Sequence, residues 1–92
     1  MSTPLEISEA AILDRVVRPQ AADWPRPAAE AILNMQFDER DREQMIGLLE
    51  KAKAGDLSSR ETAILEHYRH VGRLLELMKS RARRSLQSRA AA

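Results

Sequence analysis

Residues 57–88 read LSSRETAILEHYRHVGRLLELMKSRARRSLQS, and this long stretch without proline sets the architecture of the 92-residue chain. At its start, Ser58 and Glu61 have the spacing of a capping box, in which each side chain bonds the other residue's backbone N–H. Apolar residues then recur every three or four positions, the period of one helix face: Ile64, Leu65, Tyr68, Val71, Leu75, Met78, Ala82 and Leu86. We therefore expect one helix from Ser59 to about Ser88, about 45 Å long at 1.5 Å per residue.

The segment before this helix predicts a partner for it, from Asp38 to Ala54. Asp38 is a favoured N-cap residue, and Gly55 stands where a helix often ends in the left-handed conformation. The apolar residues between these two signals share one face: Met45, Leu48, Leu49 and Ala52. A tight turn at Gly55 would make the two helices an antiparallel hairpin.

Two shorter helices are expected nearer the N-terminus. The first runs from Ser8 to Val17 and ends before Pro19, with one apolar stripe made of Ile12, Leu13, Val16 and Val17. The prolines of residues 18–27 predict an ordered loop there, anchored by Trp24. The second helix runs from Pro27 to Asn34. Its apolar side consists of Ala28, Ala31 and Ile32, continued by Met35.

These elements predict an all-α fold of three to four helices, with residues 1–92 as a single helical domain. Residues 1–37 hold the short helices and the proline-rich loop, residues 38–88 the helical hairpin, and residues 89–92 a disordered tail. The chain has no cysteine and no apolar run long enough to span a bilayer. We expect a soluble cytoplasmic protein without a membrane partner.

The long helix carries more apolar length than a helix of residues 38–54 covers, so the N-terminal helices or a second chain must bury the remainder. We expect a homo-oligomer, most simply a dimer. Its interface would draw on seven residues of the long helix: Tyr68, Val71, Gly72, Leu74, Leu75, Leu77 and Met78. Gly72 is open to three interpretations, namely a tolerated glycine, close approach of another helix backbone, or a hinge.

No motif for catalysis is present. The three glycines lie far apart, so no phosphate-binding loop can form, and no nucleophile elbow occurs. His67 and His70 share a helix face with Glu66, and Glu43 is a conceivable further ligand, but no zinc-binding or di-iron pattern accompanies them. We expect no enzyme activity, no metal and no cofactor.

Charge is distributed unevenly along the chain. Residues 1–66 have thirteen acids and eight lysines or arginines, whereas residues 67–92 have one acid and seven lysines or arginines. The C-terminal basic residues are Lys79, Arg81, Arg83, Arg84 and Arg89. They fit a solvated helix end that complements the helix dipole, contacts to an acidic protein, or contacts to phosphates. The acidic part of the chain could also neutralise them.

Most of the chain resembles a family of small bacterial all-helical proteins without an established activity. The resemblance runs through ILDRVVRP, AAEAILNMQFDERDREQM and KAKAGDLSSRETAILEHYRHVGRLLELMKSRARRSL. Its most diagnostic part is the pattern of Tyr68, Val71-Gly72, Leu74-Leu75, the SRAR string at residues 80–83 and Ser85-Leu86, with Arg81 where the family usually has lysine. Such proteins are often encoded beside HNH-type endonuclease or toxin-like genes. The resemblance implies an accessory or antitoxin-like role with a nuclease or toxin-like partner.

The sequence therefore predicts a non-catalytic protein-binding protein that acts through its long helix and basic C-terminal end. The alternative is a nucleic-acid-binding module that uses the same basic residues. The net charge of −5 over residues 1–66 would repel phosphates, which favours the protein partner.

Overall fold

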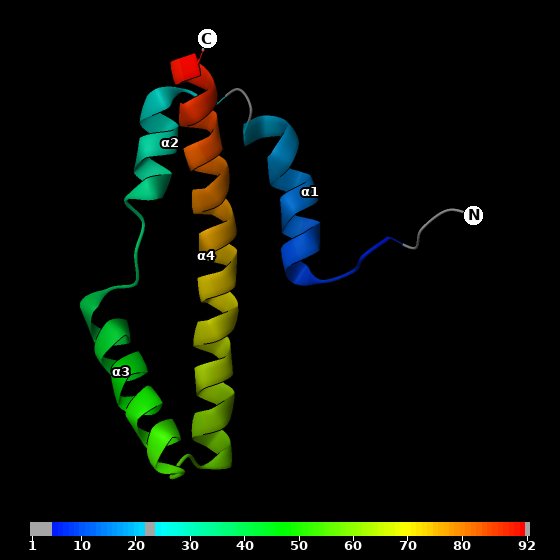
Figure 1. Ribbon diagram of the computed structural model, residues 1–92. Coiled ribbons are helices and arrows are strands. Elements are labelled where there is room, and N and C mark those ends of the chain that lie inside the picture. The colour runs from blue at the N-terminus through cyan, green and yellow to red at the C-terminus, as the bar shows by residue number, and fades with distance from the viewer. Residues whose placement is uncertain (1–4, 22–23, 92) are drawn as a thin grey trace. The chain divides into compact units, whose positions relative to one another are not determined.

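The computed structural model describes residues 5–21 and 24–91, with side chains for residues 5–19 and 24–88. The described residues form four helices and no strand (Figure 1). The helices are α1 (Glu9–Ala21), α2 (Arg26–Leu33), α3 (Glu39–Ala54) and α4 (Ser59–Ala91). The predicted all-α fold with a long C-terminal helix is confirmed. None of the described helices combines the length and the apolar character needed to cross a membrane.

The chain divides into two compact units. The first unit consists of Met1–Met35 together with Arg73–Ala92, and the second consists of Gln36–Gly72. Helix α4 supplies residues to both units, its first part pairing with α3 and its second part lying with α1 and α2.

The second unit is the predicted helical hairpin, and its end signals form as expected. The side chain of Asp38 accepts a hydrogen bond of 2.9 Å from the backbone N–H of Asp41, and Gly55 closes α3 with a φ of 74°. The capping box is reciprocal, because Ser58 Oγ accepts from the Glu61 N–H and the Glu61 carboxylate accepts from the Ser58 N–H, both at 3.1 Å. Leu48 and Leu65 are the buried apolar residues between the two helices.

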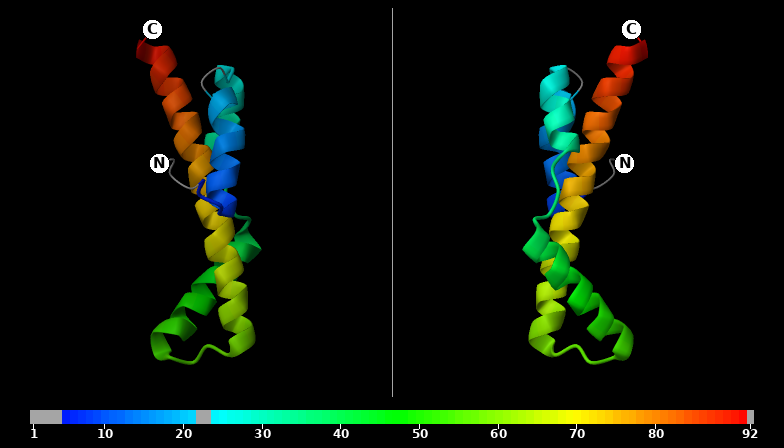
Figure 2. Two further views of the ribbon diagram at one scale, coloured as in Figure 1. Left: turned by 90° about the vertical axis from the view of Figure 1, so that its right-hand side faces the viewer. Right: turned by 90° about the vertical axis from the view of Figure 1, so that its left-hand side faces the viewer.

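In the first unit, α1 and α2 cover one face of the second part of α4. Figure 1 shows the two helices on either side of α4, and in both side views of Figure 2 they overlap each other and lie to the same side of it. The buried apolar residues of this unit are small or branched, namely Val17 of α1, Ala29 of α2 and Ala82 of α4. The opposite face of this part of α4 is left uncovered by these helices.

Helix α1 continues past Pro19 to Ala21, so the prediction that Pro19 ends the helix is wrong. A proline at position 19 removes the hydrogen bond to the carbonyl of residue 15 and crowds that carbonyl, and the helix ends two residues later. The ion pair between Arg18 and Asp14, one helical turn apart, holds the residue before the proline in helical geometry. The predicted loop of residues 18–27 is correspondingly shorter, and residues 22–23 lie outside the described part.

The predicted burial of α1 and α2 also requires correction. In α2 the fully buried residue is Ala29, whereas Ala28, Ala31 and Met35 are exposed. In α1 the side chains of Ile12 and Val16 are 45% and 65% exposed, and the buried positions are Asp14 and Val17. Helix α4 extends to Ala91, where the sequence predicted a helix end near Ser88 and a tail of residues 89–92.

Candidate partner-binding surface

Tyr68, predicted at an interface between chains, makes contacts within the helical hairpin. Its hydroxyl donates a 2.6 Å hydrogen bond to Asp41 Oδ1 on α3, and its ring meets Phe37 edge-on at a centroid distance of 6.1 Å. The hydrogen bond to the Asp41 carboxylate, together with burial, raises the pKa of Tyr68 above its usual value. Tyr68 therefore holds α3 against α4.

Gly72 lies beside an aromatic side chain. A Cβ at this position would be 4.0 Å from two ring carbons of Phe37, an ordinary van der Waals contact. Among the described residues, no backbone atom of another helix lies within 4 Å of that position. Val71, the residue before it, is exposed.

The leucines of α4 that follow line depressions beside α1. Leu74 lines a shallow, mainly apolar depression of about 320 Å³ together with Ile12, Leu13 and Val16, and Glu9 also lines it. Leu77 lies on the other flank of α1, in a cavity of about 430 Å³ that Asp14 and two arginines of α1 also line. Leu75 and Met78, also in the predicted interface, are partly buried. Much of the predicted apolar interface is therefore in use within the first unit.

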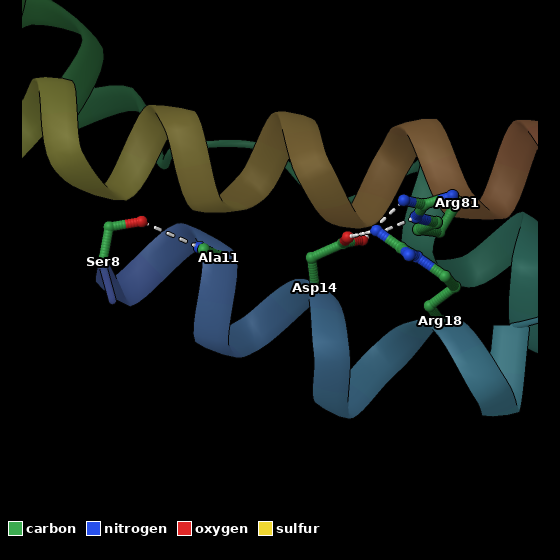
Figure 3. Close-up of polar contacts among 5 residues, drawn as sticks. All are labelled: Ser8, Ala11, Asp14, Arg18 and Arg81. Carbon is green, nitrogen blue, oxygen red and sulfur yellow. Dashed lines mark hydrogen bonds and ion pairs between the residues drawn. The ribbon is translucent and has the colours of Figure 1, made fainter. Parts of the chain in front are cut away.

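Arg81 forms the main polar contact between α1 and α4 (Figure 3). Its Nε donates a 2.8 Å hydrogen bond to Asp14 Oδ1, and its Nη2 forms an ion pair with the same oxygen at 2.6 Å, while Arg18 donates to Asp14 Oδ2. The side chains of Arg81 and Asp14 are only 16% and 13% exposed. Burial acts to raise the pKa of Asp14, but the two arginines outweigh it and hold that pKa below its usual value.

The other C-terminal basic residues lie mostly on the uncovered side of α4. Arg84 is exposed, Lys79 is partly buried, and neither has a hydrogen bond or an ion pair among the described residues. Arg83 is paired loosely with Glu76 at 3.4 Å. The side chain of Arg89 lies outside the described residues.

Sequence inspection missed Arg73 as part of this surface. Arg73 is exposed and, like Arg84, has no hydrogen bond or ion pair among the described residues. Arg84 follows Arg73 by eleven positions, just over three helical turns, so both project from nearly the same side of α4. That periodicity was the signal available in the sequence. We define the basic face of α4 as Arg73, Lys79, Arg83 and Arg84.

The second unit has a polar cavity of its own, of about 460 Å³, between α3 and α4. Lys51 and Glu61 line it and pair with each other at 2.5 Å. The bond from Lys51 lowers the pKa of Glu61, and the capping bond from the Ser58 N–H adds to this effect. The charges of this cavity thus stabilise the hairpin.

The histidines do not gather a metal site in the described part of the chain. His67 is exposed, and His70 is partly buried with a polar contact of its own. No group of three or more His, Asp or Glu side chains within the described residues is arranged to hold a metal ion.

No family model, curated protein or solved structure matches the chain. The resemblance to small bacterial proteins therefore stays a prediction, and the proposals below rest on the geometry of the described residues.

Proposed function

We propose that the protein is a non-catalytic accessory protein that binds an acidic protein partner through the basic face of α4. One observation carries this proposal. Along the second part of α4, the described residues present three exposed basic side chains, the partly buried Lys79 and one exposed acid, Glu76. Because arginine binds carboxylates through a planar fork, these side chains suit a partner rich in Asp and Glu.

Charge complementarity alone would raise the association rate and set the orientation of such a complex, but it would add little to the affinity. Exposed ion pairs contribute only about 0–1 kcal/mol each, whereas opposed charge patches accelerate association. Apolar contact must supply the rest, and the depression formed by Ile12, Leu13, Val16 and Leu74 is such a surface within the same unit. A partner helix with aliphatic anchors and acidic neighbours fits both features.

The alternative, a nucleic-acid-binding module, has fewer contacts available than the sequence suggested. Asp14 engages Arg81, which leaves the four residues of the basic face among the described side chains. Four phosphate contacts give a slope of log K against log salt of about −3.6, and binding of that strength weakens steeply at physiological salt. This is the reason for preferring the protein partner.

The test compares two double variants with the same change in net charge. Arg73→Gln with Arg84→Gln alters the basic face, whereas Arg15→Gln with Arg60→Gln alters exposed arginines on α1 and at the start of α4. Poly-L-glutamate serves as the acidic probe, and its affinity is measured by isothermal titration. We expect the first variant to lose several-fold more affinity than the second, because only the first removes charges that act together.

Equal losses in the two variants would contradict the proposal. A parallel salt titration with random duplex DNA covers the alternative. Micromolar DNA binding with the slope given above, and no binding of polyglutamate, would replace the acidic protein partner with nucleic acid.

A further inference from the structure

Three residues predicted to contact a partner, Leu74, Leu77 and Arg81, lie against α1 instead of being open to solvent. Two of these contacts have the chemistry expected of the partner. Asp14 supplies a carboxylate to Arg81, and apolar side chains of α1 lie beside Leu74. Leu77 shares a mainly polar cavity with Asp14 and two arginines of α1. Helix α1 has two acids and two arginines, so it is an amphipathic helix without net charge, and its buried carboxylate at Asp14 meets Arg81 of α4 (Figure 3).

We propose that the α4 surface beneath α1 is a second docking site, for an amphipathic helix that carries an Asp or Glu opposite Arg81, and that α1 occupies it as an internal competitor. This inference rests on the proposed function, because the competing helix would be a segment of the same acidic partner. Displacement of α1 would add Arg81 to Arg84, which lies three residues further along and nearly on the same side of α4, and would uncover both leucines. It would also remove the depression that Leu74 forms with α1, so the uncovered leucines would take over its apolar contact. The binding surface would then be both larger and more positive.

The way α1 is held supports its role as a replaceable segment. It buries its polar Asp14 and turns Ile12 and Val16 outward, the reverse of a helix built only to fill a core. A buried ion pair contributes little net stability, because removing both charges from water offsets their attraction. Val17, 8% exposed, is the one buried apolar side chain of α1 among the described residues.

The Asp14 cluster also specifies what a competitor must bring. One carboxylate engages two arginines, so Arg18 and Arg81 together exceed the charge of Asp14. A competing helix satisfies Arg81 only if it carries an Asp or Glu at the matching turn, with aliphatic residues three or four positions away. A wholly apolar helix would leave Arg81 buried and unpaired, which is unfavourable.

The experiment uses a synthetic peptide of residues 6–21 as the competing helix, with an Asp14→Asn peptide as its matched control. Binding to the full chain is followed by fluorescence anisotropy. A tethered α1 acts at an effective concentration of about millimolar, so the unaltered chain should bind the peptide weakly. The Asp14→Asn full chain should bind it about tenfold or more tightly, because its own α1 no longer engages Arg81.

Two further variants assign this gain to the covered surface. Adding Arg81→Gln to the Asp14→Asn chain should abolish it, and Asp56→Asn, which removes an equal charge from the loop after α3, should produce none. The Asp14→Asn control peptide should bind the unaltered chain and the Asp14→Asn chain with equal affinity. Equal binding of the peptide by the unaltered and Asp14→Asn chains would overturn the inference while leaving the polyglutamate result, and hence the proposed function, untouched.

Hydrogen exchange of the unaltered chain gives a readout that needs no substitution. Excess peptide should speed exchange of the α1 amides, residues 13–17, and leave those of α3 unchanged. Unchanged α1 exchange at peptide saturation would mean that the peptide binds elsewhere, which would likewise overturn the inference. If the peptide displaces α1 but polyglutamate does not bind, the inference about α1 is supported and the proposed function is contradicted.

Discussion

Gly47 lies within α3 and Gly55 directly after it. A side chain added at these two positions should have opposite effects on stability. Gly47 is an interior helical residue, and a Cβ there would meet no atom within 4 Å. Gly55 has a φ of 74°, which a side chain strains. We expect Gly47→Ala to stabilise the protein by up to about 1 kcal/mol. Gly55→Ala should destabilise it by about 1–2 kcal/mol. Urea denaturation measures both changes.

The two substitutions add the same methyl group, so each serves as the control for the other. A loss of stability in Gly47→Ala would show that the space beside Gly47 is occupied in solution.

Ser85 is a buried polar residue of α4, and no hydrogen bond among the described residues offsets the burial of its hydroxyl. It is 2% exposed, and its Oγ has no hydrogen-bond partner within the described part of the chain. A buried hydroxyl that bonds nothing carries a desolvation cost. We expect Ser85→Ala to raise the free energy of unfolding by up to about 1 kcal/mol, measured by urea denaturation. The exposed Ser88→Ala is the matched control and should change stability little; a loss of stability in Ser85→Ala would reveal a partner for its hydroxyl.

Among the elements, the start of α4 depends on one local motif. Ser58→Ala removes the side-chain acceptor for the Glu61 N–H, and we expect a loss of about 1 kcal/mol. Ser59→Ala, one position later, is the control, since Ser59 Oγ makes no hydrogen bond among the described residues. Thermal unfolding followed by circular dichroism compares the two variants. Equal effects would indicate that helix propensity, and not the capping box, sets the stability of this end.

The amphipathic period of α1 predicted a helix correctly but placed its buried face wrongly. Ile12 and Val16 share a stripe with Leu13 and Val17, so the stripe spans a wide arc of the helix surface. The structure buries one edge of that arc, at Val17, together with Asp14. Which edge faces α4 depends on the position of Arg81, sixty-seven residues away, and no local pattern contains that information.

At the scale of the whole molecule, we expect both acid and alkaline pH to lower the stability of the fold. The pKa values of Asp14 and Glu61 are lowered in the folded chain, so their contribution is present at neutral pH and is lost as the pH falls below about 4. The pKa of Tyr68 is raised, so its contribution is present below about pH 10 and is lost as the pH rises further. We expect the melting temperature to be highest between these limits.

Two variants separate the limbs of this profile. Tyr68→Phe should reduce the alkaline decrease, and Glu61→Gln should reduce the acidic one, each with little effect on the other limb. Melting temperatures from pH 2 to 11, read by circular dichroism, provide the measurement. An alkaline decrease that is unchanged in Tyr68→Phe would contradict the assigned role of the Asp41 hydrogen bond.

The fold itself neutralises part of the positive charge at the C-terminal end of the chain. The sequence left open whether the basic C-terminal end meets an external acid or the chain's own acidic part. For Arg81 the structure shows the second outcome, through Asp14, whereas Arg73 and Arg84 make no ion pair among the described residues. Self-association through α4 stays a prediction.

The all-α class, the long C-terminal helix and the ends of α3 follow from the chain itself, because helical periodicity, N-caps and a left-handed glycine act over only a few residues. The buried face of α1, the ion pair of Asp14 with Arg81 and the surroundings of Gly72 required the tertiary structure. They arise from contacts between segments distant along the chain, such as Phe37 with Tyr68 and Asp14 with Arg81. In such contacts, packing and the desolvation of charged groups decide which face of a helix is buried, and the local sequence pattern does not distinguish these faces.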